Sequence, residues 1–436
     1  MCVRQSRRAG ALSLLARAIL AASVLLFFLV LPAGCPARAQ ESAGTTVDVF
    51  RGPVISSSRV LGLGGAYTAV AEGTQGGLLN TASLANRYAW SSDWFDWDFN
   101  LDWLILVPGT DADIDNDGLY AGEGDGYLGI NLGAGLQFGR LGVGLWLNSD
   151  TFAAESGDNR LTYAFTYGYL GAAFAFLQEQ LVVGAGVGGG GLEVISWIDQ
   201  AAEGKRADWK QTGTVKWNGG GLESGVLWRP LKLPIRLGTS IRFPILIDSS
   251  KRDKIDQDLA SAPLPDSVRI PWRIATGVSF YHSFGGHPYN QRREDKAVRA
   301  AEPTPQGEGA AQPADSPPLN RRYILAAFDL VFCGPAPPGA VGASPFAGGR
   351  RAESGRTGSL SVHAGLESEV WSNRLVIRGG SYLEPPRLEE TEMRPHGTVG
   401  LDLRLFRLFY WDLRAGMSFD LAPRYYNWGL GVGFWH

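Results

Sequence analysis

The sequence has very little cysteine, with three residues in 436, at Cys2, Cys35 and Cys333. If the N-terminal 39 residues are removed on export, Cys333 is the only one left. A single cysteine excludes an intramolecular disulfide and a cysteine-ligated metal site in the mature chain. The chain beyond residue 39 also lacks a second long apolar run, a long helical period and any basic patch that would indicate nucleic-acid binding.

The N-terminus has the pattern of a secretory signal peptide. Four arginines between Arg4 and Arg17 precede an apolar run from Ala18 to Leu31, and Ala37-Arg38-Ala39 is an A-x-A cleavage pattern. About fourteen apolar residues is short for a transmembrane span. We therefore predict a signal peptide over residues 1–39, with a lipoprotein site at Cys35 as the minor alternative. Its removal leaves 35 basic and 43 acidic residues, a formal charge of −8.

The last forty residues alternate between apolar and polar side chains in three closely spaced segments. In residues 398–405 every second residue is Val or Leu, and the residues between them are Thr, Gly, Asp and Arg. Residues 409–420 and 426–435 repeat the pattern with more aromatic side chains. Strands of about ten residues with aromatics near their ends are typical of a transmembrane β-barrel, whose hydrophobic side chains face lipid and whose polar side chains face the lumen.

The same alternation predicts fourteen strands in all, hence an all-β, antiparallel, transmembrane barrel over residues 87–436. If both ends of the barrel are periplasmic, nearly all periplasmic turns are short, as outer-membrane barrels prefer. The exception is residues 285–322, which we predict to be a disordered periplasmic insertion; a tether for a periplasmic partner is the alternative. The first eleven strands are expected at 95–107, 127–138, 141–148, 161–176, 181–194, 219–228, 235–245, 269–281, 323–332, 360–371 and 374–382.

Residues 50–86 do not alternate and are rich in small residues, which suits a compact segment folded in a confined space, and we predict a hatch or plug over residues 40–86. No strand-loop-helix unit accompanies their glycines, so a phosphate loop is disfavoured. The stretches LGLGGAYTAVAEG (61–73), NTASLA (80–85) and VHAGLESEVWSNRLVIRGGSY (362–382) resemble the FadL-type outer-membrane transporters, including PorV-like relatives. That resemblance implies an N-terminal hatch inside a 14-stranded barrel. It points to these hatch or gating residues: Gly62, Gly64, Gly65, Ala66, Asn80, Thr81 and Ala82.

The predicted inward faces differ around the barrel. Early strands place glycines inward, and later strands place charged side chains inward. We expect the hatch to pack on the glycine side, with residues 61–71 against Gly144, and to hydrogen-bond to the charged side. The predicted polar network of the lumen consists of Arg236, Arg242, His363, Glu367, Arg378, Asp402, Arg404, Asp412 and Arg414.

Two local patterns suggest other chemistry. His363 near Glu367 and Asp402 could serve acid–base catalysis, but pairing of acids and bases across strands explains the same residues, and we predict that the chain is not an enzyme. Carboxylates at alternate positions followed by Gly118 suit a calcium loop in the first extracellular connection, and an acidic solvated loop is an equal alternative. The calcium candidates are Asp111, Asp113, Asp115 and Asp117; no other cofactor is expected.

By the resemblance, the function is passive uptake of hydrophobic small molecules of the fatty-acid or aromatic-hydrocarbon class across the bacterial outer membrane. The expected partners are membrane lipid and the hydrophobic ligand. The alternative is a PorV-like, non-channel barrel that binds or shuttles secreted proteins, for which a periplasmic or secreted protein would be the partner.

Overall fold

The computed structural model describes residues 45–436, so the predicted signal peptide lies outside the described residues. Among the described residues, no helix is long and apolar enough to cross a membrane. Within this range the description omits residues 51, 89–90, 92, 107–112, 114–115, 117–127, 157–158, 201–207, 249–263, 296–320, 348–350, 389–390, 409–410 and 436.

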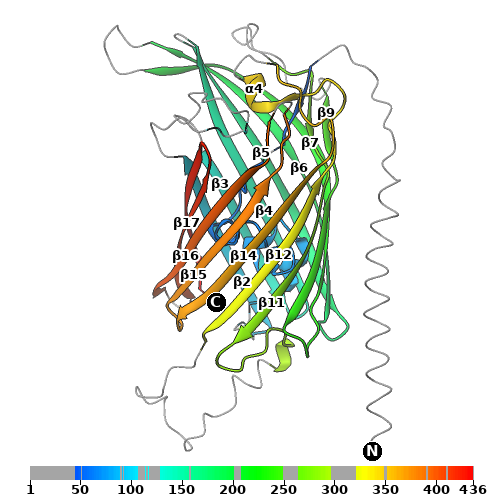
Figure 1. Ribbon diagram of the computed structural model, residues 1–436, viewed down its shortest axis with the longest axis vertical. Helices are drawn as coiled ribbons and strands as arrows, with labels where there is room; N and C mark the ends of the chain where they lie inside the picture. Colours follow the sequence, from blue (N-terminus) through cyan, green and yellow to red (C-terminus); the bar gives the residue numbers. More distant parts are fainter. Residues whose placement is uncertain are drawn as a thin grey trace, which may run out of the picture. The chain divides into compact units, whose positions relative to one another are not determined.

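Fourteen antiparallel strands close into a barrel, and the last strand, β18, pairs with the first, β2 (Figure 1). The prediction of an all-β, fourteen-stranded antiparallel barrel is therefore confirmed. The barrel strands are β2 (Phe95–Leu106), β3 (Leu128–Phe138), β4 (Leu141–Ser156), β5 (Asn159–Phe176), β6 (Leu181–Asp199), β7 (Trp209–Trp228), β8 (Ile235–Arg242), β11 (Arg273–Ser283), β12 (Tyr323–Cys333), β14 (Ser359–Trp371), β15 (Leu375–Glu384), β16 (Arg394–Leu408), β17 (Trp411–Ala422) and β18 (Tyr425–Phe434).

Two strands are shorter than predicted, and proline is the physical reason. The strands predicted at 235–245 and 269–281 include Pro244 and Pro271, whereas β8 ends at Arg242 and β11 begins at Arg273. Proline has no backbone N–H to donate to the ladder, so it is confined to strand ends and edges. The chain on the far side of each proline forms a separate strand, β9 (Ile245–Asp248) and β10 (Ser267–Ile270).

The barrel wall has an apolar outer surface. Along β16 buried and exposed residues alternate from Arg394 to Leu403, and Val399 is 56% exposed whereas its neighbour Gly400 is buried. Large aliphatic side chains such as Leu170 and Leu366 are 63% and 57% exposed. In water such a belt would be unstable, but against hydrocarbon it is the expected surface of an outer-membrane barrel. The short turns assign the end at β3–β4 and β14–β15 to the periplasm.

A second, four-stranded sheet lies at the outer, extracellular end of the barrel, in the order β13-β1-β10-β9. Its strand β1 (Thr46–Asp48) is the first described element, and it pairs in parallel with β10 and with β13 (Val341–Gly342). Since β9 and β10 belong to the connection between β8 and β11, the N-terminal strand is built into the extracellular connections.

Between β1 and β2 the chain runs inside the barrel, where its helical turns are visible in blue (Figure 1). We call residues 49–56 the strap and residues 57–87 the plug. The plug contains α2 (Ser58–Gly62) and the 3-10 turns η1 (Thr74–Gly76) and η2 (Thr81–Ala85), and almost all of its residues are buried.

The start of the periplasmic insertion differs from the predicted disorder. Tyr289 and Asn290 are 6% and 2% exposed, and the side chain of Asn290 donates to the carbonyl of Ile235 at 2.9 Å. Residues 289–291 are therefore packed against the barrel. The central part of the insertion, residues 296–320, lies outside the described residues.

Candidate functional site

The plug packs on the glycine side of the wall through η2 and η1. A Cβ atom placed at Gly142 would lie 2.0 Å from the carbonyl oxygen of Leu84, and one at Gly184 would lie 2.6 Å from Thr81. Gly144 also faces Leu84. The expectation that residues 61–71 lie against Gly144 is therefore wrong: they pack on the opposite wall, where Leu63 meets Gly365.

Adding a methyl group on this wall tests how tightly the plug is seated. We expect Gly142→Ala to displace Leu84 and to lower the stability of the plugged barrel by about 1–3 kcal/mol, the usual cost of overpacking. Gly397→Ala is the matched control, because nothing lies within 4 Å of its Cβ position. Denaturant unfolding of the detergent-solubilised barrel, followed by tryptophan fluorescence, measures both. Equal midpoints for the two variants would contradict close packing of the plug.

The predicted hatch residues sit at the points where the plug turns. Gly64 and Gly65 have positive φ angles of 62° and 80°, and a Cβ atom on Gly64 would lie 2.7 Å from the backbone nitrogen of Ser381. Asn80 caps η2, since its Oδ1 accepts from the backbone N–H of Ala82 at 3.0 Å and its Nδ2 donates to the carbonyl of Thr68 at 2.8 Å. The remaining predicted hatch residues, Gly62, Ala66 and Thr81, are also buried.

A chain of buried ion pairs joins the plug to the charged wall. Arg59 of α2 lies 2.7 Å from a carboxylate oxygen of Glu367 on β14. Arg378 also contacts Glu367 and lies 2.7 Å from Asp402, which in turn is 2.9 Å from Arg414. Each of these side chains is at most 7% exposed. Four of the residues predicted to line the lumen are thus brought together around one arginine of the plug.

Glu72 makes a second junction between plug and wall. Its carboxylate lies 2.7 Å from Arg236 on β8 and 3.1 Å from Arg59. Arg236 also donates to the carbonyl of Val70 at 3.0 Å and to Asn290 at 2.9 Å, so it connects the plug to the periplasmic insertion. Sequence reasoning missed Arg59 and Glu72, although they are two of only three charged residues in residues 57–87.

Burial and neighbouring charges fix the protonation of the plug. Burial raises the pKa of the Tyr67 phenol well above its usual value, so Tyr67 stays neutral and donates to the carbonyl of Glu72 at 3.0 Å. Burial alone would lower the pKa of Arg59, but Glu367, Tyr67 and Glu72 raise it above its usual value. Arg59 therefore stays charged, and Tyr67 stays neutral, at physiological pH.

Four predicted lumen residues lie apart from this network, and one of them, Arg242, pairs with Glu223 and donates to the carbonyl of Leu78 in the plug. Arg404 and Asp412 pair with each other at 2.7 Å near the periplasmic end and do not touch the plug. His363 does not join Glu367 and Asp402: its Nδ1 is 2.7 Å from the carbonyl oxygen of Gly64, and its Nε2 is 2.8 Å from the Ser361 hydroxyl. The catalytic arrangement considered from sequence is therefore not assembled, and the absence of enzymatic activity stays a prediction.

A second polar cluster, nearer the mouth, was missed by sequence reasoning. His396 lies 2.9 Å from Glu384 and 2.8 Å from Asp420, and Asp420 accepts from the Tyr382 hydroxyl at 2.6 Å. Tyr382 also accepts from the backbone N–H of Val54 in the strap at 3.2 Å. The predicted strand began at Thr398, because Pro395 hides the start of β16 in the sequence pattern.

The calcium prediction stays untested. Asp111, Asp115 and Asp117 lie outside the described residues, and Asp113 is buried with its carboxylate 3.5 Å from Arg394. Among the described residues, no group of three or more potential ligands could hold a metal ion.

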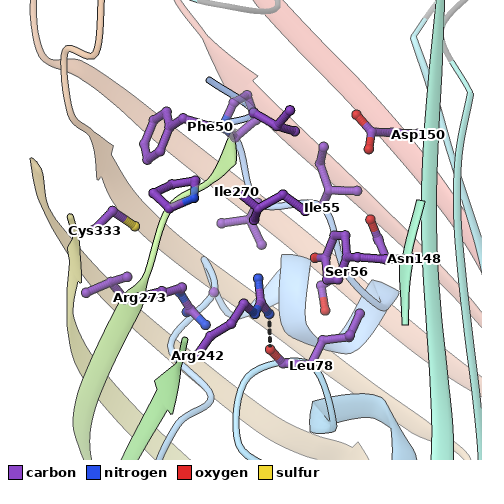
Figure 2. Close-up of a pocket in the computed structure, with 18 of the residues that line it drawn as sticks. Phe50, Ile55, Ser56, Leu78, Asn148, Asp150, Arg242, Ile270, Arg273 and Cys333 are labelled. Atoms are coloured by element: carbon purple, nitrogen blue, oxygen red, sulfur yellow. Dashed lines mark hydrogen bonds between the residues drawn. The ribbon is translucent and has the colours of Figure 1, made fainter. Parts of the chain in front are cut away.

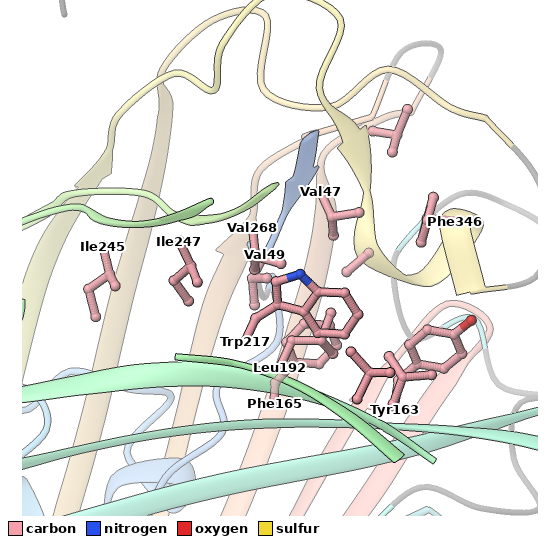
Figure 3. Close-up of a cluster of buried hydrophobic side chains, with 14 of the residues drawn as sticks. Val47, Val49, Tyr163, Phe165, Leu192, Trp217, Ile245, Ile247, Val268 and Phe346 are labelled. Atoms are coloured by element: carbon pink, nitrogen blue, oxygen red, sulfur yellow. The ribbon is translucent and has the colours of Figure 1, made fainter. Parts of the chain in front are cut away.

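The mouth of the barrel is covered by the four-stranded sheet. Its apolar residues, including Val47, Ile247 and Val268, pack against inward side chains of the long strands, including Leu192 and Trp217, which are 2% and 0% exposed (Figure 3). We call this sheet the lid. It is continuous in sequence with the strap and the plug, because β1 leads directly into residues 49–56.

A cavity of about 160 Å³ lies inside the barrel between lid and plug (Figure 2). Apolar walls come from Phe50 and Ile55 of the strap, Ile270 at the end of β10, and Leu78 of the plug. Its floor carries Arg242, whose guanidinium donates to the carbonyl of Leu78 at 2.9 Å. The cavity is thus bounded by the lid, the strap and the plug.

No family model matches the sequence, and no curated protein matches it. Solved structures are similar in architecture: the CymD monoaromatic hydrocarbon channel (10% identity, 87% of this chain and 96% of that chain, TM-score 0.48) and the Pseudomonas putida toluene transporter TodX (13%, 88% and 98%, 0.47). A Pseudomonas aeruginosa FadL homologue is 11% identical over 87% of this chain and 96% of that one, with a TM-score of 0.45. These likenesses carry no information on the ligand. With its closed fourteen-stranded barrel, its apolar belt and its internal plug, the chain has the architecture of an outer-membrane barrel.

Proposed function

We propose that this protein is a passive outer-membrane transporter for hydrophobic small molecules of the fatty-acid or aromatic-hydrocarbon class. The observation that carries the proposal is the cavity between lid and plug, which has apolar walls from Phe50, Ile55, Ile270 and Leu78. Ligand pockets are typically concave and largely apolar with a few polar groups. A ligand enters this cavity from the mouth and leaves when the plug shifts between two positions, which requires no cofactor.

The presence of the plug favours a gated route for the ligand and argues against a permanently open pore. Glycine contacts on one wall and ion pairs on the other hold residues 57–87 across the lumen. A fourteen-stranded barrel is wider than barrels whose own side chains fill them, so without the plug it would leak. The gate is the plug, and the residues that hold it are Arg59, Glu72, Glu367 and Arg236.

The alternative is a non-channel barrel that binds or shuttles secreted proteins, as in PorV-like relatives. The dense ion pairing of the plug favours this alternative, because a permanent seal needs such pairs. The apolar cavity favours transport, because a sealed scaffold has no need of a ligand-sized space.

Uptake distinguishes the two. We expect cells that produce the protein to accumulate radiolabelled toluene or a labelled fatty acid several-fold faster than cells that lack it. The filled-cavity variant Ile55→Trp is expected to remove the difference without changing the amount of folded barrel in the membrane. Equal uptake in the presence and absence of the protein, for both compounds, would support the scaffold alternative.

A further inference from the structure

The cavity floor carries two arginines on adjacent strands. Arg273 of β11 is the direct register partner of Arg242 of β8, and both line the cavity (Figure 2). The guanidinium of Arg242 already has partners, since it lies 3.3 Å from the carboxylate of Glu223 and donates to the carbonyl of Leu78. Arg273, in contrast, makes no ion pair and no side-chain hydrogen bond with any residue that the structure describes.

A guanidinium without an anionic partner inside the barrel is costly, because the charge has lost part of its hydration without gaining a partner. Asp150 and His363 also line the cavity; Figure 2 shows Asp150 on the far wall, away from Arg273, and His363 is hydrogen-bonded to Gly64. Guanidinium groups match carboxylates particularly well, through two parallel N–H···O bonds. A ligand carboxylate would supply the missing partner.

The size of the cavity restricts the rest of the ligand. Its volume of about 160 Å³ is close to that of apolar protein cavities that hold a single benzene ring. Phe50, Ile55 and Ile270 supply the surfaces for such a body. A long alkyl chain would not fit inside without displacing the strap or the lid.

We propose that the cavity binds a small amphipathic carboxylate of about one aromatic ring in size, with its carboxylate on Arg273 and its ring against Phe50, Ile55 and Ile270. This proposal rests on the transport function above and narrows its ligand class. A neutral hydrocarbon of the same size fills the same space but leaves Arg273 unpaired, so it binds more weakly.

Cys333 provides a direct reporter of occupancy. It lines the same cavity, is the register partner of Arg273 on β12, and is the only cysteine among the described residues. The rate at which N-ethylmaleimide modifies Cys333 in the purified, detergent-solubilised protein therefore measures access to the cavity. We expect benzoate to slow this reaction and toluene to require at least a tenfold higher concentration for the same protection.

Variants of Arg273 distinguish the effect of its charge on ligand binding from the effect of the cavity's shape. Arg273→Gln is expected to raise the half-protecting benzoate concentration at least tenfold and to leave protection by toluene unchanged, whereas Arg273→Lys keeps part of the benzoate effect. Lys216→Gln is the control, because Lys216 pairs with Glu193 and does not line the cavity. If Arg273→Gln does not fold, the comparison of benzoate with toluene on the unmodified protein still decides.

Two results would overturn the proposal, and they differ in what they say about transport. If toluene and benzoate protect Cys333 equally, and Arg273→Gln changes neither, the ligand has no need of a carboxylate. The proposed transport of hydrophobic molecules is then unaffected. Protection by neither compound, together with no binding of either in equilibrium dialysis, rejects the ligand site and the proposed transport function together.

Discussion

Replacing Glu367 with glutamine is expected to unseat the plug and to open the barrel to ions. Glu367 is 1% exposed and accepts from Arg59 at 2.7 and 2.8 Å, from Arg378, and from the Tyr323 hydroxyl at 2.7 Å. Removal of its charge leaves two buried guanidiniums without this shared anion. Breaking a buried pair costs about 3–5 kcal/mol, and here the two guanidiniums keep only one anionic partner each, Glu72 for Arg59 and Asp402 for Arg378.

The expected readout is conductance. In planar bilayers Glu367→Gln should show frequent open-channel events where the unmodified protein is mostly closed, and cells producing it should become sensitive to vancomycin, a hydrophilic antibiotic too large to cross an intact outer membrane. The matched control is Glu193→Gln, which breaks the pair with Lys216 on partly exposed side chains, where ion pairs contribute about 0–1 kcal/mol. A closed and equally stable Glu367→Gln barrel would show that the ion pairs do not hold the plug.

Locking the lid is expected to abolish uptake. Thr46 of β1 and Ser267 of β10 are register partners with their hydroxyl oxygens 2.7 Å apart, so cysteines at these two positions should form a disulfide. The lid closes the mouth above the cavity, and β1 continues into the strap and plug. Joining β1 to β10 therefore holds the entrance shut, and a reductant should restore uptake.

The experiment is made in a Cys333→Ser background and measured as uptake of the labelled ligand before and after reduction. Cysteines at Leu246 and Arg269 form the control, because these register partners join β9 to β10 and leave β1 free. We expect normal uptake in that variant. Full uptake in the oxidised Thr46–Ser267 variant would mean that ligands reach the cavity without displacement of β1.

Much of the barrel was readable from the sequence. Alternation at period two depends only on each residue and its neighbours, so it predicted all fourteen strands and their order along the chain. It failed at Pro244 and Pro271, where an apolar pattern continued but the ladder could not. It also missed the first residues of β16, where Pro395 interrupts the expected composition.

The candidate site was less predictable. The charged wall was expected, but its partners on the plug, Arg59 and Glu72, were not, and Gly144 was matched with the wrong part of the plug. Alternation says which side of the wall a residue faces and says nothing about what meets it inside. The plug has no repeat, so its path is set only by packing against walls that are distant in sequence.

The sequence by itself determined that the chain forms a closed, antiparallel, membrane-spanning barrel, because lipid outside and polar lumen inside impose a local pattern on every strand. Only the tertiary structure decided how the lumen is filled. Three features depend on contacts between residues far apart along the chain: β1 pairs with β10 in the lid, Leu84 packs on the glycine side of the wall, and Arg273 lies unpaired beside the cavity. Such contacts arise when the barrel closes, and no local pattern encodes them.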